Sequence, residues 1–278
     1  DGTQYDGLDG NDVVILPTNA VEAAEAGFDI STVVEGGAGN DHITGSELND
    51  VVRGGDGDDV LIGGAGADSL GGGAGKDIIL GGAGFDTFSA DAGDDFLDGE
   101  AGGAFLFASG ASVFIDLAAG ISISATTGTD TLANISTVQG TGNDDTLIGD
   151  ANNNSLRGAF GNDIIDGGDG NDNISGGQGD DILDGGLGLD RADFFQGFGG
   201  VVVDVTAGTS TGGAGNDTFM NFEQFAGTNF ADVITGDAND NFFYGRGGDD
   251  ILNGGDGDDG FEAGDGNDII NGGAGNDS

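Results

Sequence analysis

The sequence contains no cysteine, one histidine and only five basic residues among 278. The missing cysteines exclude disulfides, thiol nucleophiles and thiolate zinc sites, and a lone histidine cannot supply a two-histidine zinc motif. Five basic side chains are too few for a basic patch, so nucleic-acid binding is excluded and an anionic membrane surface would repel the chain. No apolar run approaches the roughly 18 residues that span a bilayer, so we expect no membrane insertion.

Against these absences stand 51 acidic residues, which give a formal net charge of −46 at pH 7. Repulsion on this scale opposes a compact state unless cations bind. The composition therefore indicates a chain that folds around metal ions.

Residues 36 to 98 consist of seven nine-residue units in unbroken phase: GGAGNDHIT, GSELNDVVR, GGDGDDVLI, GGAGADSLG, GGAGKDIIL, GGAGFDTFS and ADAGDDFLD. Their pattern is G-G-x-G-x-D-x-U-x, where U is a large apolar residue. Glycines at positions 1, 2 and 4 permit positive φ, so positions 1 to 6 are expected to form a turn. Positions 7 to 9 are expected to form a short strand whose position-8 side chain faces inward. The predicted core residues are Ile43, Val52, Leu61, Leu70, Ile79, Phe88 and Leu97.

The aspartate at position 6 of each unit offers a hard carboxylate oxygen, the ligand type that calcium selects. The same position recurs in an opening partial unit (7–15) and in two later arrays. A flexible Gly/Asp-rich linker is the alternative, but a linker needs no apolar residue at every ninth position. The candidate calcium ligands, together with backbone carbonyls of the turns, are Asp12, Asp41, Asp50, Asp59, Asp68, Asp77, Asp86, Asp95, Asp145, Asp163, Asp172, Asp181, Asp190, Asp232, Asp250, Asp259, Asp268 and Asp277.

These units resemble the repeats of the repeats-in-toxin (RTX) family, also called haemolysin-type calcium-binding repeats. The resemblance implies an all-β fold, a right-handed parallel β-roll or β-solenoid, with two nonapeptides per coil and calcium between turns 18 residues apart. Counting aspartate pairs at that spacing predicts about eleven Ca²⁺ ions. Such oxygen sites fill at extracellular calcium concentrations, so we expect a secreted protein, which in this family implies type I secretion.

The period fails twice, which divides the chain into three modules. We predict a first module at 1–98 with regular repeats at 36–98, a second at 99–193 with repeats at 140–193, and a third at 194–278 with repeats at 227–278. Alternating runs at 113–117, 121–125 and 201–205 are expected to be strands of irregular β inserts.

Residues 19–27 have helical propensity for one short turn or a loop. Because the last unit is incomplete and no signal sequence is recognisable, we expect a segment of a longer protein.

The second nonapeptide of each module departs from the glycine pattern. Asn154 and Asn241 even replace the position-6 carboxylate by an amide. An amide oxygen can bind calcium but brings no charge, so we expect these turns to be weak or empty sites.

Five apolar residues occupy positions 7 and 9 of alternate coils, where side chains should face solvent: Val60, Ile62, Ile78, Leu80 and Phe96. We call them the apolar stripe. It predicts an interface, with a copy of the chain or with an insert folding back, although ordinary exposed strand residues are the alternative.

His42 is expected at the surface, and the phenylalanines are expected to fill the core rather than to stack on sugars.

We expect a non-catalytic, secreted, calcium-binding structural module of a cell-surface, adhesive, filament or surface-layer protein. Its partners would be calcium and either copies of itself or other cell-surface components. The alternative is a non-catalytic accessory module of a secreted enzyme such as a lipase, protease or polysaccharide epimerase. Paired carboxylates do not indicate glycoside hydrolysis here, because they recur throughout the chain at ligand spacing.

Overall fold

The structure is a computed structural model that describes residues 4–7, 9–17 and 33–278. Within these ranges every regular element is a β-strand, which confirms the all-β prediction. The turn or loop expected at 19–27 lies outside the described residues. No helix long and apolar enough to cross a membrane is found in the described ranges.

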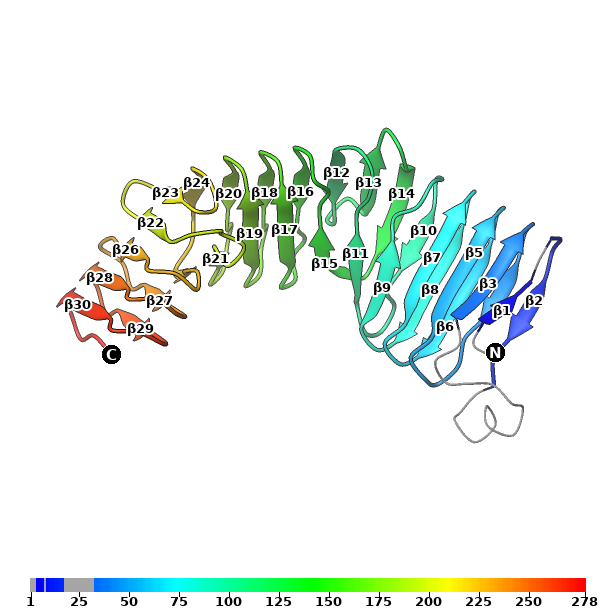
Figure 1. The fold of residues 1–278 in the computed structure, drawn as a ribbon, viewed down its shortest axis with the longest axis horizontal. Coiled ribbons are helices and arrows are strands. Elements are labelled where there is room, and N and C mark those ends of the chain that lie inside the picture. The colour runs from blue at the N-terminus through cyan, green and yellow to red at the C-terminus, as the bar shows by residue number, and fades with distance from the viewer. Residues whose placement is uncertain (1–3, 8, 18–32) are drawn as a thin grey trace. The chain divides into compact units, whose positions relative to one another are not determined.

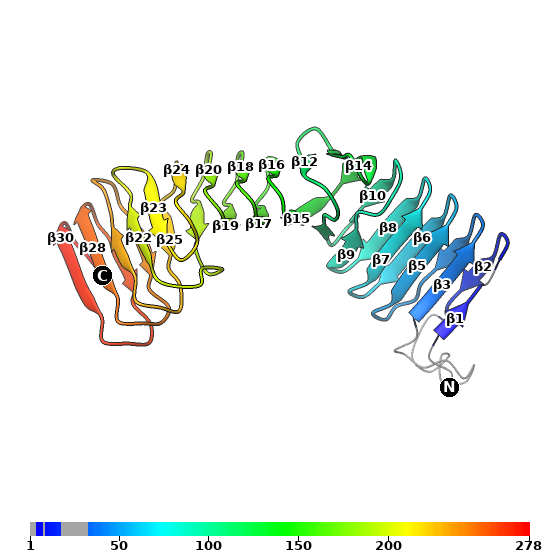
Figure 2. The ribbon, with the colours of Figure 1, turned by 45° about the horizontal axis from the view of Figure 1, so that its top comes forward.

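The chain forms two compact units, Asp1–Gln139 and Gly140–Ser278. Each unit is a β-solenoid whose chain passes alternately through two parallel sheets, here called sheet A and sheet B (Figures 1 and 2). The predicted β-solenoid is therefore confirmed. The division into three sequence modules stays a prediction.

The first unit contains strands β1 to β15. Its sheet A consists of β1 (Gln4–Asp6), β3 (Val33–Ala38), β5 (Val51–Asp56), β7 (Ser69–Ala74), β9 (Asp86–Ser89), β11 (Ala104–Phe107) and β15 (Ile135–Gln139). Its sheet B consists of β2 (Val13–Ile15), β4 (His42–Thr44), β6 (Val60–Ala65), β8 (Ile78–Ala83), β10 (Phe96–Asp98), β14 (Gly128–Ala133), β13 (Ile121–Ser124) and β12 (Val113–Asp116).

The second unit repeats this plan with strands β16 to β30. Sheet A consists of β17 (Ser155–Phe160), β19 (Asn173–Gln178), β21 (Arg191–Asp193), β25 (Gln224–Ala226), β27 (Phe242–Tyr244) and β29 (Gly260–Glu262). Sheet B consists of β16 (Thr146–Ile148), β18 (Ile164–Asp166), β20 (Ile182–Asp184), β24 (Thr218–Met220), β23 (Thr209–Gly212), β22 (Val201–Asp204), β26 (Val233–Thr235), β28 (Ile251–Asp256) and β30 (Ile269–Ala274).

Neighbouring strands of one sheet are one coil apart in sequence. In sheet A, Val52 pairs with Leu70, and in sheet B, Leu61 pairs with Ile79, both at a separation of 18 residues. This register places each position-8 side chain directly above its equivalent in the next coil. All seven predicted core residues of the first array are at most 1% exposed. The nine-residue period therefore sets both the register and the core.

The two inserts lie within the stack as β-hairpins. In the first unit β12 and β13 pair antiparallel, β13 pairs antiparallel with β14, and β14 returns parallel to β10. In the second unit β22, β23 and β24 repeat this order, with β24 parallel to β20. The strands expected at 113–117, 121–125 and 201–205 are confirmed. Each insert thus replaces regular coils without interrupting the sheets.

The phenylalanines fill only part of the core. Phe88, Phe225 and Phe243 are fully buried, and Phe225 stacks on Phe243 with ring centroids 6.1 Å apart. Phe160 and Phe198, by contrast, are more than half exposed. The core-filling prediction therefore holds for some of the rings and fails for others.

Candidate metal sites in the stacked turns

The position-6 carboxylates form ladders along the edges of the solenoid. One oxygen of Asp77 accepts the backbone N–H of Asp59 at 2.8 Å, and Asp59 in turn accepts that of Asp41 at 2.7 Å. Asp181 and Asp163 repeat the contact in the second unit at 2.8 Å. Each aspartate therefore fastens its own turn to the turn one coil earlier. The side chains are buried because the glycine-rich turns close over them.

The other oxygen of most ladder aspartates has no hydrogen-bond partner. Burying an ionised carboxylate oxygen without a hydrogen-bond donor costs free energy. A cation bound at each such oxygen would offset this cost. The ladder aspartates with a buried, unpartnered Oδ2 are Asp12, Asp41, Asp59, Asp68, Asp77, Asp86, Asp163, Asp172, Asp181, Asp190, Asp250 and Asp259.

Main-chain oxygens converge on the same places. A Cβ atom on Gly54, at position 1 of its turn, would overlap both Asp59 Oδ2 and the carbonyl oxygen of Gly72 in the next coil. Gly36 and Gly158 show the same arrangement. Only glycine leaves this space open. The oxygens around it are hydrogen-bond acceptors and cannot satisfy one another. Carboxylate and carbonyl oxygens in such a space are the donor set that Ca²⁺ prefers.

No group of three His, Cys, Asp or Glu side chains surrounds a single point among the described residues. A site in these turns must therefore combine one or two carboxylates with backbone carbonyls. This composition suits calcium, which accepts six to eight oxygens of mixed type, and does not suit zinc.

The backbone at position 2 separates two kinds of turn. In what we call open turns, φ at position 2 is positive, as at Gly55 (121°) and Gly73 (104°), and the Oδ2 oxygen has no donor. In closed turns, position 2 carries Ser46, Thr141 or Thr228, none of which has a positive φ. There the turn itself supplies the donors that an open turn lacks.

Closed turns satisfy their own carboxylate. The Ser46 backbone N–H donates to Asp50 Oδ2 at 2.7 Å, and its hydroxyl donates to the same oxygen at 2.9 Å. The N–H of Thr141 reaches Asp145 Oδ2 at 2.6 Å, and the N–H of Thr228 reaches the corresponding oxygen of Asp232 at 2.6 Å. These aspartates were predicted as ligands from their position alone, and the structure leaves their Oδ2 oxygens already bonded.

The two asparagine turns are closed in the same way. The N–H of Asp150 donates to Asn154 Oδ1 at 2.7 Å, and the N–H of Asp237 donates to Asn241 Oδ1 at 3.1 Å. The amide oxygen that could have faced an ion is occupied by its own turn. This geometry gives a second reason, besides the missing charge, to expect weak or empty sites there.

Two open turns keep the positive φ without glycine. Position 2 is Ala159 in one, with φ 86°, and Arg246 in the other, with φ 71°. A side chain in this region costs about 1–2 kcal/mol. The Arg246 guanidinium is held by both carboxylate oxygens of Asp193, at 2.9 and 2.7 Å. The conformation of position 2, rather than glycine itself, therefore distinguishes an open turn.

Burial raises the pKa of the ladder carboxyls, most strongly for Asp77 and Asp163, each to about 7. Loss of hydration is the largest cause, the hydrogen bond from the preceding turn lowers the pKa, and neighbouring ladder aspartates raise it again. Asp59 and Asp68 are raised to about 6 in the same way. Without cations, Asp77 and Asp163 are therefore partly protonated near neutral pH.

The predicted ligands nearest the chain ends are less enclosed. Asp12 and Asp268 are half-buried, and Asp277 is exposed. The remaining predicted ligands lie in the buried ladders.

Three acidic residues outside the nonapeptides also belong to the ladders and were missed in the sequence. Asp130 Oδ1 accepts the N–H of Asp95 at 3.2 Å, and Asp217 Oδ1 accepts that of Asp181 at 3.1 Å. Glu223 plays the same part for the N–H of Asp190, at 2.9 Å. The signal for the two aspartates was present: GTDTL (128–132) and GNDTF (215–219) repeat the G-x-D-x-U half of the nonapeptide.

The apolar stripe lies on the outer face of sheet B. Val60, Ile78 and Phe96 form one row across β6, β8 and β10, and Ile62 pairs with Leu80 in a second row. Ile78 is 42% exposed and the other four are half-buried. His42 continues the first row on β4 and is exposed, as predicted.

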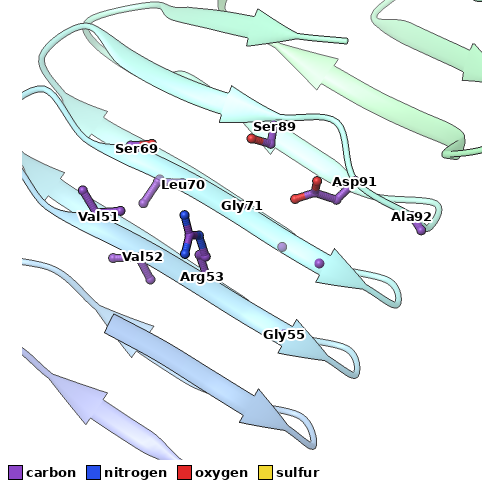
Figure 3. Close-up of a pocket in the computed structure, with 12 residues that line it drawn as sticks. Val51, Val52, Arg53, Gly55, Ser69, Leu70, Gly71, Ser89, Asp91 and Ala92 are labelled. Carbon is purple, nitrogen blue, oxygen red and sulfur yellow. The ribbon is translucent and has the colours of Figure 1, made fainter. Parts of the chain in front are cut away.

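A shallow pocket of about 510 Å³ lies on the outer face of sheet A (Figure 3). Gly71 leaves it open, with Arg53 on one flank and Ser89 and Asp91 on the other. The Arg53 guanidinium already pairs with Glu35 at 3.1 Å. This pocket could not be predicted from the sequence, because it arises from a missing side chain at one outward position, Gly71.

Comparison with known families agrees with this geometry. A family model described as the RTX calcium-binding nonapeptide repeat matches residues 31–47, 35–70, 44–79, 71–106, 139–173, 158–192, 226–261 and 248–278, which together cover well over half of the chain. No curated protein matches the chain.

Proposed function

The chain belongs to the family of RTX calcium-binding nonapeptide repeat proteins, and on that premise we propose that it is a secreted module that becomes ordered when Ca²⁺ enters its open turns. The family and the fold together make it a calcium-binding structural module. The proposal adds the coupling between calcium and folding, and the place where both occur.

The buried, unpartnered Asp Oδ2 oxygens carry this proposal. A stack of such oxygens in a chain of net charge −46 is unfavourable without cations, so binding energy becomes folding energy. Turns of this type fill at the millimolar calcium outside cells and stay empty at cytosolic calcium. We therefore propose that folding follows secretion. We propose no reaction for the module itself, because its one histidine is exposed and its buried aspartates all lie in the ladders.

Circular dichroism during a calcium titration tests the coupling. Protein freed of metal by dialysis against a chelator should show little β signal, gain it on addition of Ca²⁺, and gain much less with Mg²⁺, which tolerates irregular carbonyl sites poorly. A chelated sample that keeps its β signal and melts cooperatively would contradict the proposal.

We further propose that the outer face of sheet B is a contact surface of the parent assembly, for a second copy or another cell-surface component. The aligned rows of the apolar stripe support this. The double variant Ile78→Asp/Leu80→Asp should dissociate calcium-dependent assemblies in analytical ultracentrifugation. The control, Ser69→Asp/Ser89→Asp on the polar face of sheet A, adds the same charge and should leave them intact. The same assembly state for both variants would contradict the proposed interface.

A further inference from the structure

The turn that begins β14 in the first insert contains a buried aspartate, Asp130. We propose that Asp130, which lies outside every nonapeptide, is a ligand of a further calcium ion shared with the turn 90–95. The inference rests on the proposed function, because it extends the same chemistry to a segment that neither the repeat pattern nor the family match includes.

The insert turn is stacked on turn 90–95 like one nonapeptide turn on another. In the regular stack of turns 54–59 and 72–77, four hydrogen bonds join the turns: Gly57 N–H to Ala74 O (2.7 Å), Lys76 N–H to Asp58 Oδ1 (2.9 Å), Ile78 N–H to Asp59 O (2.9 Å) and Asp59 N–H to Asp77 Oδ1 (2.8 Å). All four recur at the insert: Gly93 N–H to Thr127 O (2.7 Å), Thr129 N–H to Asp94 Oδ1 (2.9 Å), Thr131 N–H to Asp95 O (2.8 Å) and Asp95 N–H to Asp130 Oδ1 (3.2 Å).

Gly128 meets the same steric requirement as a position-4 glycine. Its φ is 107°, and a Cβ there would overlap the carbonyl oxygen of Gly93. Gly57, at position 4 of a regular turn, has φ 132° and would overlap the carbonyl oxygen of Gly39 in the same way. The backbone of the insert turn is therefore that of a ladder turn, although only half of the motif is present.

The Asp130 carboxylate has an unsatisfied oxygen like those of the open turns, although Thr126, at position 2 of its turn, has no positive φ. The residue is 1% exposed, and its Oδ2 is buried without a hydrogen-bond partner. Ser122 lies opposite Asp130 in the β13–β14 pairing. Its hydroxyl is near enough to lower the pKa of the Asp130 carboxyl, but its geometry falls short of the hydrogen bond that would satisfy Oδ2. The charges of Asp95 and Asp94 act on the Asp130 carboxyl and raise its pKa. A cation held by Asp130 Oδ2 and backbone carbonyls of the two turns would satisfy this buried oxygen.

The second insert differs at this point. Asp217 Oδ2 accepts a hydrogen bond from the Ser210 hydroxyl at 2.6 Å, so its carboxylate is satisfied within the hairpin. The proposal is therefore confined to the first insert, and the second insert provides its control.

A local terbium reporter and an ion count test the proposal in the full chain. The chain contains no tryptophan, so a single introduced tryptophan sensitises Tb³⁺ only near its own position. Thr131→Trp places the indole at an exposed position next to Asp130, and Thr218→Trp places it at the equivalent exposed position next to Asp217. Native mass spectrometry at saturating Ca²⁺ counts the bound ions.

In the Thr131→Trp background, Asp130→Asn should bind one calcium ion fewer and lose most of the sensitised Tb³⁺ emission. The asparagine keeps the acceptor for the Asp95 N–H, and the chain already buries Asn154 and Asn241 at ladder positions. The matched control is Asp116→Asn, which removes one charge from the same hairpin at a side chain that only accepts the Ala119 N–H. It should change neither readout.

An unchanged ion count and emission in Asp130→Asn would overturn the proposal while leaving the proposed function intact. Absence of bound calcium in every variant would instead contradict the proposed function. Should Asp130→Asn fail to fold in calcium, the two reporters in the otherwise intact chain decide. Emission from Thr131→Trp several-fold above that from Thr218→Trp supports the site, and equal emission overturns it.

Discussion

At the scale of single residues, the turns of this protein differ in whether the Oδ2 oxygen of the position-6 aspartate accepts a hydrogen bond. The same aspartate, in the same position of the same repeat, has an unpartnered Oδ2 in an open turn such as that of Asp77 and a fully bonded one in the closed turn of Asp50. Between these two turns the difference lies four residues earlier, at position 2, where Gly73 has a positive φ and Ser46 does not. A list of position-6 aspartates therefore overstates the number of open sites.

Asp77→Asn tests the role of an open-turn carboxylate. The variant keeps the acceptor for the Asp59 N–H but loses the charged oxygen, so we expect apparent calcium affinity to fall on the order of tenfold and thermal stability in calcium to fall with it. Without metal, at neutral pH, it should be no less stable, because a desolvated charge has been removed. Calorimetric titration and thermal melts measure both. Asp56→Asn, at an exposed side chain of the same array, is the control and should match the native protein.

The raised pKa values predict opposite pH dependences with and without calcium. The pKa of Asp77 rises from 3.8 to about 7 on folding, so the folded form prefers the protonated carboxyl. That contribution to stability is complete below the unfolded pKa and disappears as the pH rises through the folded one. Metal-free protein should thus be more ordered at about pH 4 than at about pH 8, whereas calcium affinity should weaken as the pH falls below about 7. Dichroism and calcium titrations across this range test both, and pH-independent behaviour would contradict the assignment of these carboxyls.

At the scale of the turn and strand, the glycines differ in what they do. Gly179 has φ 143°, and a Cβ there would overlap the Gly161 carbonyl oxygen, whereas a Cβ on Gly142 meets nothing within 4 Å. Gly179→Ala should lower the free energy of unfolding in calcium by at least about 1–2 kcal/mol. Gly142→Ala, in another turn of the same unit, should change it by less than about 0.5 kcal/mol. Urea unfolding measures both, and equal losses would mean that turn packing does not depend on position 4.

The strands, their register and the core could be predicted from the sequence wherever the nonapeptide repeat is regular. The alternation at Ile43 and Leu61 fixed strand, register and core, because a period of nine leaves one inward side chain per strand. The hairpins were found as strands, but the ladder position of Asp130 was not, since only half of the motif precedes it. The closed turns at Thr141 and Thr228 were missed because a threonine at position 2 reads as a minor deviation, whereas its N–H decides the site.

At the scale of the whole molecule, charge alone does not explain the need for calcium. Sodium chloride at about 0.5 M screens repulsion between exposed acids but cannot supply a ligand field to buried oxygens. We expect that concentration of salt to contract the metal-free chain slightly, without the β signal or the fall in hydrodynamic radius that millimolar calcium produces. Light scattering and dichroism on the same samples check this. Full folding in salt alone would mean that screening, and not coordination, drives order.

The ladders have a polarity that follows from which partner donates. The backbone N–H of each position-6 aspartate donates to the carboxylate of the aspartate 18 residues later in the chain. A chain emerging from a pore with its N-terminal end first would leave every turn waiting for the next coil, so order would lag behind emergence by one coil. A chain emerging with its C-terminal end first would present each new amide to a carboxylate already in place, and every coil would template its successor.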